Sequence, residues 1–406
     1  MAYREIDVNL TEQHRSLRDT VRKFGAEVVR PAGLALDKLA DPADVIAEGS
    51  VLWDVIRQAR ELGLHRARMP RAVGGYMEDM DAMSRVILGE EMGYADAGLA
   101  ISMGAGNLPF SMAALFPNPK LQEIARAYAE DTKGELIGCW AITDPDHGSD
   151  YTLGGDDPRC GPSVRGVLKG DEYIVNGQKS AWVSNGTIAT HAVLHVGLDP
   201  SKGMGGQGLA LIPLDLPGIS RGKPLDKIGQ RPLNQGEIFF EDARIPKEYM
   251  VLTPEMGIME GNREATLADV NGDMAIVFAG VAKAAYDEAF NYASERVQGG
   301  VPIIEHQNIK LKLFRMFTLV EAARGAARRM ALYNAVNHPP SGAHAVACKC
   351  LSTETAFQVA SEAIQILAGN GLTREYPIEK MFRDARASMI EDGVNESLAL
   401  SAFEYL

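Results

Sequence analysis

Two neighbouring acidic residues near the end of the chain have the side chains that acid–base chemistry requires. Glu391 and Asp392 stand directly before Gly393. A carboxylate in a dry pocket can act as a general base, because burial raises its affinity for protons. An Asp-Gly pair is also typical of an ordinary turn, so this segment by itself is compatible with both interpretations.

Two earlier parts of the chain could contact a ligand. Residues 142–150, ITDPDHGSD, offer Thr143, Ser149 and backbone N–H groups on a loop shaped by proline and glycine. Such a loop can face a planar or phosphorylated ligand, or it can be a surface turn. Further on, Trp182 lies two positions before Ser184 in a β-like run, and a tryptophan on a strand usually packs in a core.

Two other patterns resemble binding motifs without the context that binding needs. Gly203, Gly205 and Gly208 match the G-x-G-x-x-G spacing of a dinucleotide-binding turn. That turn requires a helix that starts on the glycines, whereas a strand-like run follows here, so we expect a hairpin loop. His191 and His195 lie in a β-like run without the carboxylate of a zinc-binding helix, so we expect no metal site.

The elements that must position these residues follow in the order helix, strand, helix. We expect an α+β fold with an N-terminal α-helical domain (1–135), a middle antiparallel β-sheet or barrel domain (136–255) and a C-terminal four-helix bundle (256–406). Short apolar runs between turn dipeptides such as Asn176-Gly177 indicate the sheet. Three long Ala- and Leu-rich stretches with short connections indicate the bundle; they are 275–295, 309–336 and 345–367.

The first helix is expected to begin after Thr11, which is a suitable N-cap, and to end at Pro31. Apolar residues recur in it at spacings of three and four, which places them on one face of the helix. They are Leu17, Val21, Phe24 and Val28.

The composition excludes several classes of protein. The 406 residues are 46% hydrophobic and 23% charged, and the net charge is −13. Such a chain is not intrinsically disordered, and its acidic surface disfavours nucleic acid as a partner. It has no uninterrupted run of about 18 apolar residues that would predict a membrane-spanning helix, and MAYREIDVNL lacks the layout of a secretory signal. We therefore expect a cytoplasmic protein without a membrane partner.

Four cysteines do not form a disulfide framework or a metal site, and we expect them to be small buried side chains.

Four segments together carry a resemblance to a known family. They are residues 143–150, with Asp144 where Glu is usual, and residues 176–185, 295–307 and 365–385. In this order and spacing they resemble the signature segments of the acyl-CoA dehydrogenases, a family of flavoproteins. The resemblance covers essentially the whole chain, and the family's order of helices, sheet and bundle agrees with the order expected above.

The resemblance implies one non-covalent FAD per subunit and α,β-dehydrogenation of an acyl-CoA thioester, in which a β-hydride passes to flavin N5. It further implies an electron-transfer flavoprotein as the electron acceptor and a homotetramer, or at least a dimer. Thr143, Trp182 and Ser184 would contact the isoalloxazine ring, and Ser149 would contact the CoA moiety. The residues that would reach the pyrophosphate and adenine of an FAD in a neighbouring subunit are Arg296, Gln307, Gln365 and Gly369. Gly299 stands where the family has a phenylalanine.

The resemblance also suggests which carboxylate is the base. Most of the family places a Glu before a glycine in this loop, which puts Asp392 in the base position and Glu391 where an aromatic residue is usual. We therefore favour Asp392 over Glu391. Some members place the base on the long helix instead, where Val270 aligns between Asp269 and Asp273, so the sequence does not support that relocation.

The Asp in place of Glu leaves other functions open. It is also the pattern of the nitroalkane oxidases, flavoenzymes of the same superfamily, so a nitroalkane-oxidase-like flavin oxidase is the alternative. A dehydrogenase for a cyclic, aromatic or branched acyl group fits as well, whereas Gly89 before Glu90 disfavours a dicarboxylyl substrate. A non-catalytic flavin-binding homologue is the third alternative, although the retained acidic residue argues against lost catalysis.

Overall fold

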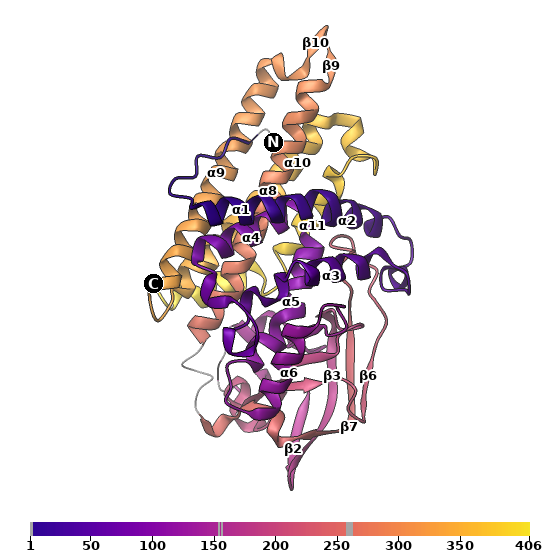
Figure 1. The fold of residues 1–406 in the computed structure, drawn as a ribbon, viewed down its shortest axis with the longest axis vertical. Helices are drawn as coiled ribbons and strands as arrows, with labels where there is room; N and C mark the ends of the chain where they lie inside the picture. Colours follow the sequence, from indigo (N-terminus) through magenta and orange to yellow (C-terminus); the bar gives the residue numbers. More distant parts are fainter. Residues whose placement is uncertain (1–2, 153–154, 156, 257–262) are drawn as a thin grey trace.

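The computed structural model describes residues 3–152, 155, 157–256 and 263–406. Helices come first, a sheet follows, and long helices return (Figure 1). The predicted boundary between residues 135 and 136 falls between the helix α6 (Pro119–Glu130) and the strand β1 (Gly138–Ala141). The predicted boundary after residue 255 adjoins residues 257–262, which lie outside the described residues.

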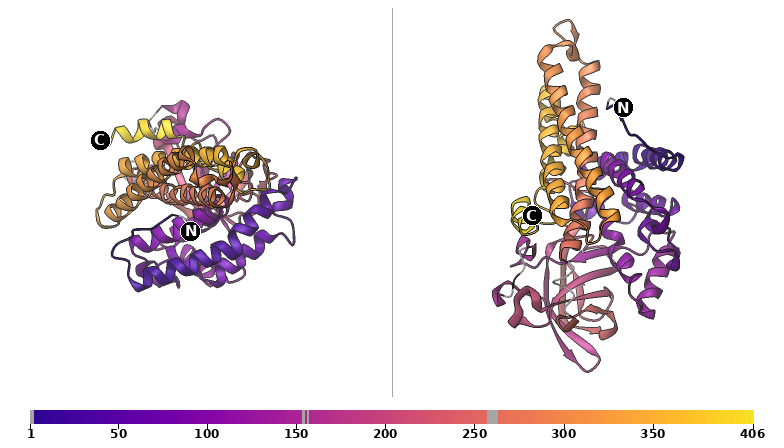
Figure 2. Two further views of the ribbon diagram at one scale, coloured as in Figure 1. Left: turned by 90° about the horizontal axis from the view of Figure 1, so that it is seen from above. Right: turned by 90° about the vertical axis from the view of Figure 1, so that its left-hand side faces the viewer.

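The N-terminal helices lie beside the long helices and against the sheet (Figures 1 and 2). Before α6 they are α1 (Glu12–Phe24), α2 (Arg30–Asp37), α3 (Val51–Glu61), α4 (Ala82–Ala95) and α5 (Ala97–Ala113). The predicted cap of α1 is confirmed, because Oγ1 of Thr11 accepts a hydrogen bond from the His14 N–H at 3.1 Å.

The prediction that Pro31 ends the first helix is wrong. A π-helical turn, Gly25–Val29, continues directly from α1 into α2. Pro31 lies in the first turn of α2, where the proline ring and its missing N–H are tolerated. The wide π turn thus lets the chain stay helical through the proline, and α2 ends only at Asp37.

The middle region is one mixed, open sheet. After β1 its strands are β2 (Arg165–Lys169), β3 (Glu172–Ser184), β4 (His191–Gly197), β5 (Gln207–Pro213), β6 (Ile219–Arg221), β7 (Gln235–Pro246) and β8 (Met250–Leu252). The order is β6-β7-β3-β2-β4-β5-β8, with β1 also paired to β4. Most neighbours are antiparallel as predicted, but β1 and β2 each run parallel to β4.

Two details of the sheet bear on the sequence predictions. Of the two alternatives expected for this domain, the sheet is confirmed and the barrel is excluded, because β6 and β8 are the two ends of the strand order and do not pair with each other in the described chain. Gly203 and Gly205 lie in the connection between β4 and β5, an antiparallel pair, and Gly208 lies at the start of β5, so the prediction of a hairpin loop is confirmed.

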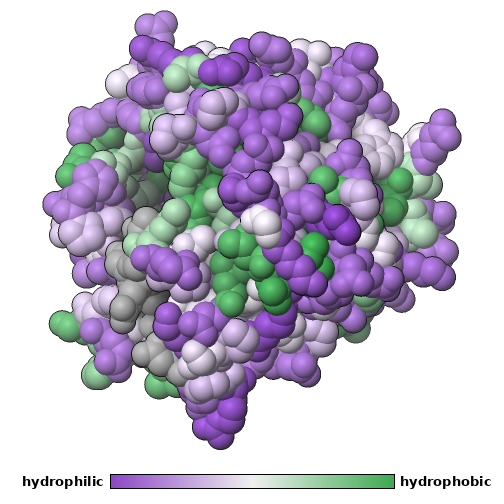
Figure 3. All heavy atoms as spheres, turned by 90° about the horizontal axis from the view of Figure 1, so that it is seen from below, coloured by the Kyte–Doolittle hydropathy of each residue, from purple (hydrophilic) through white to green (hydrophobic). Residues whose placement is uncertain are grey.

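One face of the sheet packs against α5 and α6. Phe110 of α5 stacks on Tyr128 of α6 with the ring centroids 3.9 Å apart, and both rings belong to the apolar core that the strands line. Seen from the sheet end of the molecule, the surface is largely hydrophilic, with hydrophobic side chains in separate patches (Figure 3).

The C-terminal region is a bundle of long helices. They are α8 (Arg263–Glu295), α9 (Gln307–Val336), α10 (Gly342–Leu367), α11 (Ile378–Ser388) and α12 (Asn395–Phe403). The hairpin of β9 (Val297–Gln298) and β10 (Val301–Pro302) caps the end that points away from the sheet (Figure 2). Fully buried residues such as Phe278 and Ala360 join α8 to α10. The predicted bundle is confirmed.

The helix α8 is long and apolar enough to cross a membrane by length and composition alone. Its most apolar window, however, is 67% buried within the fold. A core helix of a bundle passes the same test, and the burial of α8 between α4, α9 and α10 accounts for its apolar sequence.

Candidate active site

The loop 143–150 is fastened to strand β3. The N–H of Ser180 donates to the Thr143 carbonyl at 2.8 Å. Asp144 and Lys179 form an ion pair at 2.7 Å between side chains that have no exposed surface. A fully buried pair of this kind fixes both partners, because separating them would leave an uncompensated charge in the interior. Thr143 is therefore held beside the strand that carries Trp182 and Ser184.

Trp182 does not pack in the core, contrary to what its place on a strand suggests. Its surface is 59% exposed. Side chains two positions apart on a strand point to the same face, so Trp182 and Ser184 offer an aromatic ring and a hydroxyl group on one side of β3. Gln235 donates from Nε2 to the Trp182 carbonyl at 3.1 Å and to Oγ of Ser184 at 3.2 Å. An exposed aromatic surface with a hydroxyl beside it fits a planar ring system such as isoalloxazine.

Residues 391–395, which we name the base loop, lie between α11 and α12 and include the first residue of α12, Asn395. Asp392 and Gly393 both have positive φ angles, 53° and 99°. Asp adopts this left-handed conformation more readily than most residues, though at some cost, and such strain clusters at functional sites. Among the described residues the carboxyl group of Asp392 has no hydrogen-bond or ion-pair partner, and the residue keeps exposed surface.

Unlike Asp392, Glu391 has a hydrogen-bond partner for its carboxyl group among the described residues. Nε2 of the buried Gln230 donates to Oε1 of Glu391 at 2.6 Å. Burial and the neighbouring Asp392 raise the pKa of Glu391 to about 8. Glu391 is thus largely protonated at neutral pH. The pKa of Asp392 is also raised, because the surrounding protein partly desolvates its carboxyl group, although the charge of Lys349 opposes this effect. Of two carboxyls this close, one holds a proton and the other is free to accept one.

The base loop meets the loop 143–150. The N–H of Val394 donates to Oγ of Ser149 at 3.1 Å. Lys227 donates to Oε1 of Gln235 at 2.8 Å, and its positive charge lowers the pKa of Glu391 against the effect of burial. The structure thus gathers into one region most of the predicted site residues, namely Thr143, Ser149, Trp182, Ser184, Glu391 and Asp392.

The remaining predicted FAD residues lie at the other end of the bundle. Gln365 is 16 positions along α10 from Lys349, which contacts the base loop, so about 24 Å of helix separates the two ends. One chain does not bring these residues to its own Trp182. All of them are exposed: Arg296, Gln307, Gln365 and Gly369. The glycine that replaces the family's phenylalanine has a backbone reason, since Gly299 has a φ of 64° in the β9–β10 turn.

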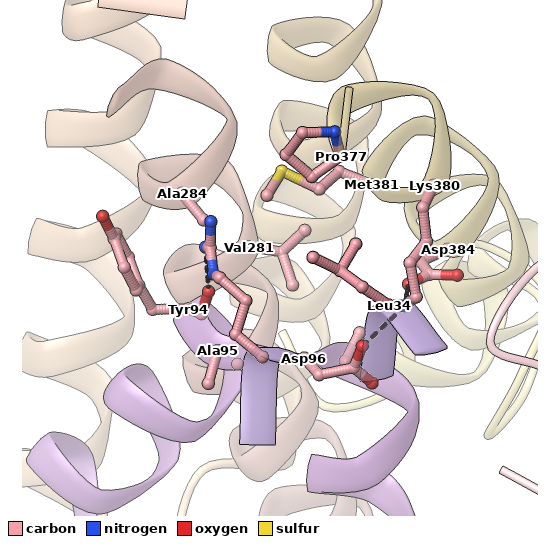
Figure 4. A pocket seen from close by; sticks show the side chains of 13 residues that line it. Leu34, Tyr94, Ala95, Asp96, Val281, Ala284, Pro377, Lys380, Met381 and Asp384 are labelled. Atoms are coloured by element: carbon pink, nitrogen blue, oxygen red, sulfur yellow. Dashed lines mark hydrogen bonds and ion pairs between the residues drawn. The ribbon is translucent and has the colours of Figure 1, made fainter. Parts of the chain in front are cut away.

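Lys380, Asp96 and Asp384 form a buried group of charges, which we name the buried triad. It is linked to the base loop through Gln230. Lys380 donates to Asp96 at 2.6 Å and to Asp384 at 2.5 Å (Figure 4). Asp384 also accepts the backbone N–H of Gln230 at 2.5 Å. The triad borders a small cavity of about 20 Å³ between α2, α4, α8 and α11. Gln230 therefore links the buried triad to Glu391.

Sequence reasoning did not identify Gln230, Lys349 or the buried triad. Lys380 and Asp384 lie inside the segment 365–385 that carries the resemblance, but their pairing was not visible. Gln230 follows Lys227-Ile228-Gly229, which reads as a polar loop, and its burial depends on contacts with α11.

Other candidates for relocation or metal binding are accounted for. Asp273 and Asp269 pair with Arg68, at 3.9 Å for Asp269, so neither is left as a free base on α8. Within the described ranges, no three His, Cys, Asp or Glu residues are grouped so that they could hold a metal ion. The four cysteines are free thiols, of which Cys139 and Cys348 are buried.

Comparison with known proteins agrees with the geometry. The chain matches the families described as acyl-CoA dehydrogenase N-terminal domain over residues 11–123, middle domain over 139–243 and C-terminal domain over 264–402. The mitochondrial short-chain specific acyl-CoA dehydrogenase of Rattus norvegicus is 30% identical over 394 residues, which cover 96% of this chain and 89% of the relative.

Solved structures show the same architecture. Butyryl-CoA dehydrogenase from Megasphaera elsdenii superposes with a TM-score of 0.85 at 26% identity and covers 98% of this chain and 99% of its own. A chain from a structure described as the electron transferring flavoprotein of Acidaminococcus fermentans gives a TM-score of 0.84 at 27% identity, with the same coverage.

Proposed function

Because this chain belongs to the acyl-CoA dehydrogenase family, we propose that Asp392 removes the α-proton of an acyl-CoA thioester during its α,β-dehydrogenation. The family carries out flavin-dependent acyl-CoA dehydrogenation with FAD as its cofactor. The observation that supports Asp392 is its exposed carboxyl group in a left-handed turn, with no hydrogen-bond or ion-pair partner among the described residues, in a loop whose Val394 N–H donates to Ser149.

The residues of this chain divide the proton chemistry between them. Asp392 accepts the α-proton, and the electron pair of that C–H bond stays with the thioester. Glu391 stays protonated because burial and the neighbouring Asp392 raise its pKa, so it does not compete for the proton. Bound FAD would supply the acceptor for the hydride that the β-carbon loses.

The shorter side chain must be compensated by the position of the loop. Asp reaches about 1.5 Å less far than Glu, and a proton transfer is sensitive to such a distance. The base loop is held by Ser149 at Val394 and by Lys349 at Gly393. A fixed backbone on both positions after Asp392 is what a short base needs to keep its place over the substrate.

The cofactor residues support a proposal about assembly. Thr143, Trp182 and Ser184 would hold the flavin ring of their own subunit, and Ser149 would contact CoA. The exposed residues at the far end would hold the pyrophosphate and adenine of a partner's FAD; they are Arg296, Gln307, Gln365 and Gly369. We therefore propose a homotetramer or dimer, and an electron-transfer flavoprotein as the electron acceptor.

The substrate proposal is limited to the acyl-CoA class. Glu90 is buried and pairs with Arg324 and, at 2.6 Å, with Arg328, so it is committed to the core and not to a distal carboxylate. A cyclic, aromatic or branched acyl group remains the proposal that the altered base favours.

The Asp at the base position also favours a second candidate, a nitroalkane-oxidase-like flavin oxidase. The two candidates differ in what reduces the flavin and in what reoxidises it. We would mix the FAD-loaded protein without oxygen with a panel of acyl-CoAs and nitroalkanes, follow the loss of flavin colour, and then admit air.

The dehydrogenase proposal predicts bleaching by an acyl-CoA only, with slow recovery of the colour in air and fast recovery with an electron-transfer flavoprotein. Bleaching by nitroalkanes with rapid recovery in air would replace it with the oxidase. No bleaching by either class would point to the non-catalytic homologue.

A further inference from the structure

Lys349 is a buried ammonium group without a carboxylate partner in the part of the chain that the structure describes. It lies on α10 with none of its surface exposed. Every other buried lysine forms an ion pair with an acidic side chain; these are Lys179, Lys283 and Lys380. An interior charge without a counter-charge is costly, so its presence needs an explanation.

Lys349 donates its hydrogen bonds to the base loop instead. Its Nζ lies 2.9 Å from the carbonyl oxygen of Gly393 and 2.8 Å from Oδ1 of Asn395. The amide of Asn395 donates to Oγ1 of Thr353, one turn further along α10, at 3.2 Å. Side chains of α10 thus hold the residues that follow Asp392 by hydrogen bonds. Asp392 itself is in the left-handed conformation, with a positive φ angle.

The charges around Lys349 come from the elements that it touches. The titratable groups that act on it are Asp392, Cys350, Glu391 and Glu396. Burial lowers the pKa of Lys349, and these groups oppose that effect. In return, the charge of Lys349 lowers the pKa of Asp392 against the effect of burial. Lys227 is the other cation that acts on the adjacent Glu391.

We propose that Lys349 is a positioning residue for the reaction: it clamps the base loop through Gly393 and Asn395 and supplies the charge that keeps Asp392 deprotonated. The hydrogen bonds explain the clamp, since both acceptors lie within three residues of Asp392. No carboxylate pairs directly with Lys349 among the described residues, so its positive charge is not neutralised. Of the acidic groups around Lys349, Asp392 has the strongest electrostatic effect on it. This inference rests on the proposed function, because it takes Asp392 to be the base.

The test is the pH dependence of anaerobic flavin reduction by the acyl-CoA that bleaches the FAD-loaded wild-type protein fastest. In Lys349→Met the charge is gone, so Asp392 should lose its proton only at higher pH. We expect the rising limb of the pH profile to move up by about one unit, which slows reduction by about tenfold at pH values below the limb. The rate should recover in part at higher pH.

Asn395→Asp tests the same charge in a side chain of the same shape. The new carboxylate pairs with Lys349 and neutralises it, so the limb should again move up. This variant keeps the test valid if Lys349→Met does not fold.

Lys283→Met is the matched control. It removes an equally buried lysine that pairs with Glu5 and does not touch the base loop. We expect a lower free energy of unfolding and an unmoved pH profile, because a merely structural role does not change the pKa of the base.

The outcomes separate this inference from the proposed function. If Asp392→Asn abolishes reduction while neither Lys349→Met nor Asn395→Asp moves the limb, Asp392 is the base and the role of Lys349 is refuted. If Asp392→Asn reduces at the wild-type rate, the proposed function fails, and the role of Lys349 fails with it.

Discussion

The base loop and the buried triad lie on either side of Gln230, yet they treat their carboxylates in opposite ways. Asp384 of the triad receives bonds from Lys380 and from the Gln230 backbone. Asp392 of the base loop receives none from the described residues and is exposed. A charge with satisfied partners stabilises the fold, whereas a charge without them is available to react. The contrast separates groups that build the site from the group that performs the chemistry.

The largest expected effect on stability is in the buried triad. Lys380→Met leaves Asp96 and Asp384 buried side by side without a cation, and we expect the free energy of unfolding to fall by about 3–5 kcal/mol. Urea denaturation measures it. Lys312→Met, which breaks a partly exposed pair with Glu362 at the surface of the bundle, should cost no more than about 1 kcal/mol. Equal losses in both variants would remove the distinction between the triad and surface pairs.

Acid should destabilise the fold through groups that are buried without a charged partner. Burial lowers the pKa of His65, His191 and His195 to about 4 from 6.5. The unfolded chain therefore binds protons that the folded chain does not, so stability is complete above pH 6.5 and is lost as the pH falls toward 4.

We expect the free energy of unfolding to be lower at pH 4.5 than at pH 7 by roughly 3 kcal/mol or more. Urea titrations at several pH values measure this, and His65→Gln should make the dependence shallower. An unfolding free energy that stays constant over this range would show that the imidazoles are not held neutral.

A smaller effect is expected at the tethered carboxyl of the base loop. Glu391→Gln keeps the shape and the hydrogen-bond capacity of a side chain that is already largely protonated at pH 7, so flavin reduction should slow by less than about tenfold. Stopped-flow bleaching without oxygen measures it, with Glu396→Gln on α12 as the control. A much larger loss would make Glu391 the base and Asp392 its neighbour.

The smallest effect on stability is expected at the far end of the bundle. Gln365 is exposed, so Gln365→Ala should change the free energy of unfolding by no more than about 0.5 kcal/mol. FAD should nevertheless bind more weakly, which a flavin fluorescence titration detects, because we place Gln365 against a partner's cofactor. Unchanged FAD affinity would argue against that arrangement.

Local signals in the sequence predicted much of the fold. Thr11 caps its helix through a contact three residues away, and the long bundle helices follow from their own periodicity. Pro31 misled because the π turn before it depends on packing: Gly25 lies so close to α4 that an added Cβ would be 3.0 Å from the Cβ of Ala95. The parallel pairing of β1 with β4 also joins segments about 50 residues apart, which no local pattern encodes.

For the candidate site, too, local sequence signals predicted the segments but not the contacts between them. The segments that carry Thr143, Trp182 and Asp392 could be found from residue types and order, and the Asp-Gly pair did form a left-handed turn. The contacts that give those residues their properties could not be found. Gln230 meets Glu391 across 161 positions, and Lys349 meets Gly393 across 44. Such pairs are specified by the tertiary fold and not by spacing.

The most direct test of the account measures two properties of one variant, Asp392→Asn. We predict that FAD-loaded Asp392→Asn is reduced by acyl-CoA at least about 100-fold more slowly than the wild type without oxygen. Its free energy of unfolding should stay within about 0.5 kcal/mol of the wild-type value, because the carboxylate makes no hydrogen bond or ion pair among the described residues and Asn also tolerates the left-handed turn. Reduction at the wild-type rate, or a loss of stability as large as that of Lys380→Met, would contradict the central claim that Asp392 is the reactive carboxylate.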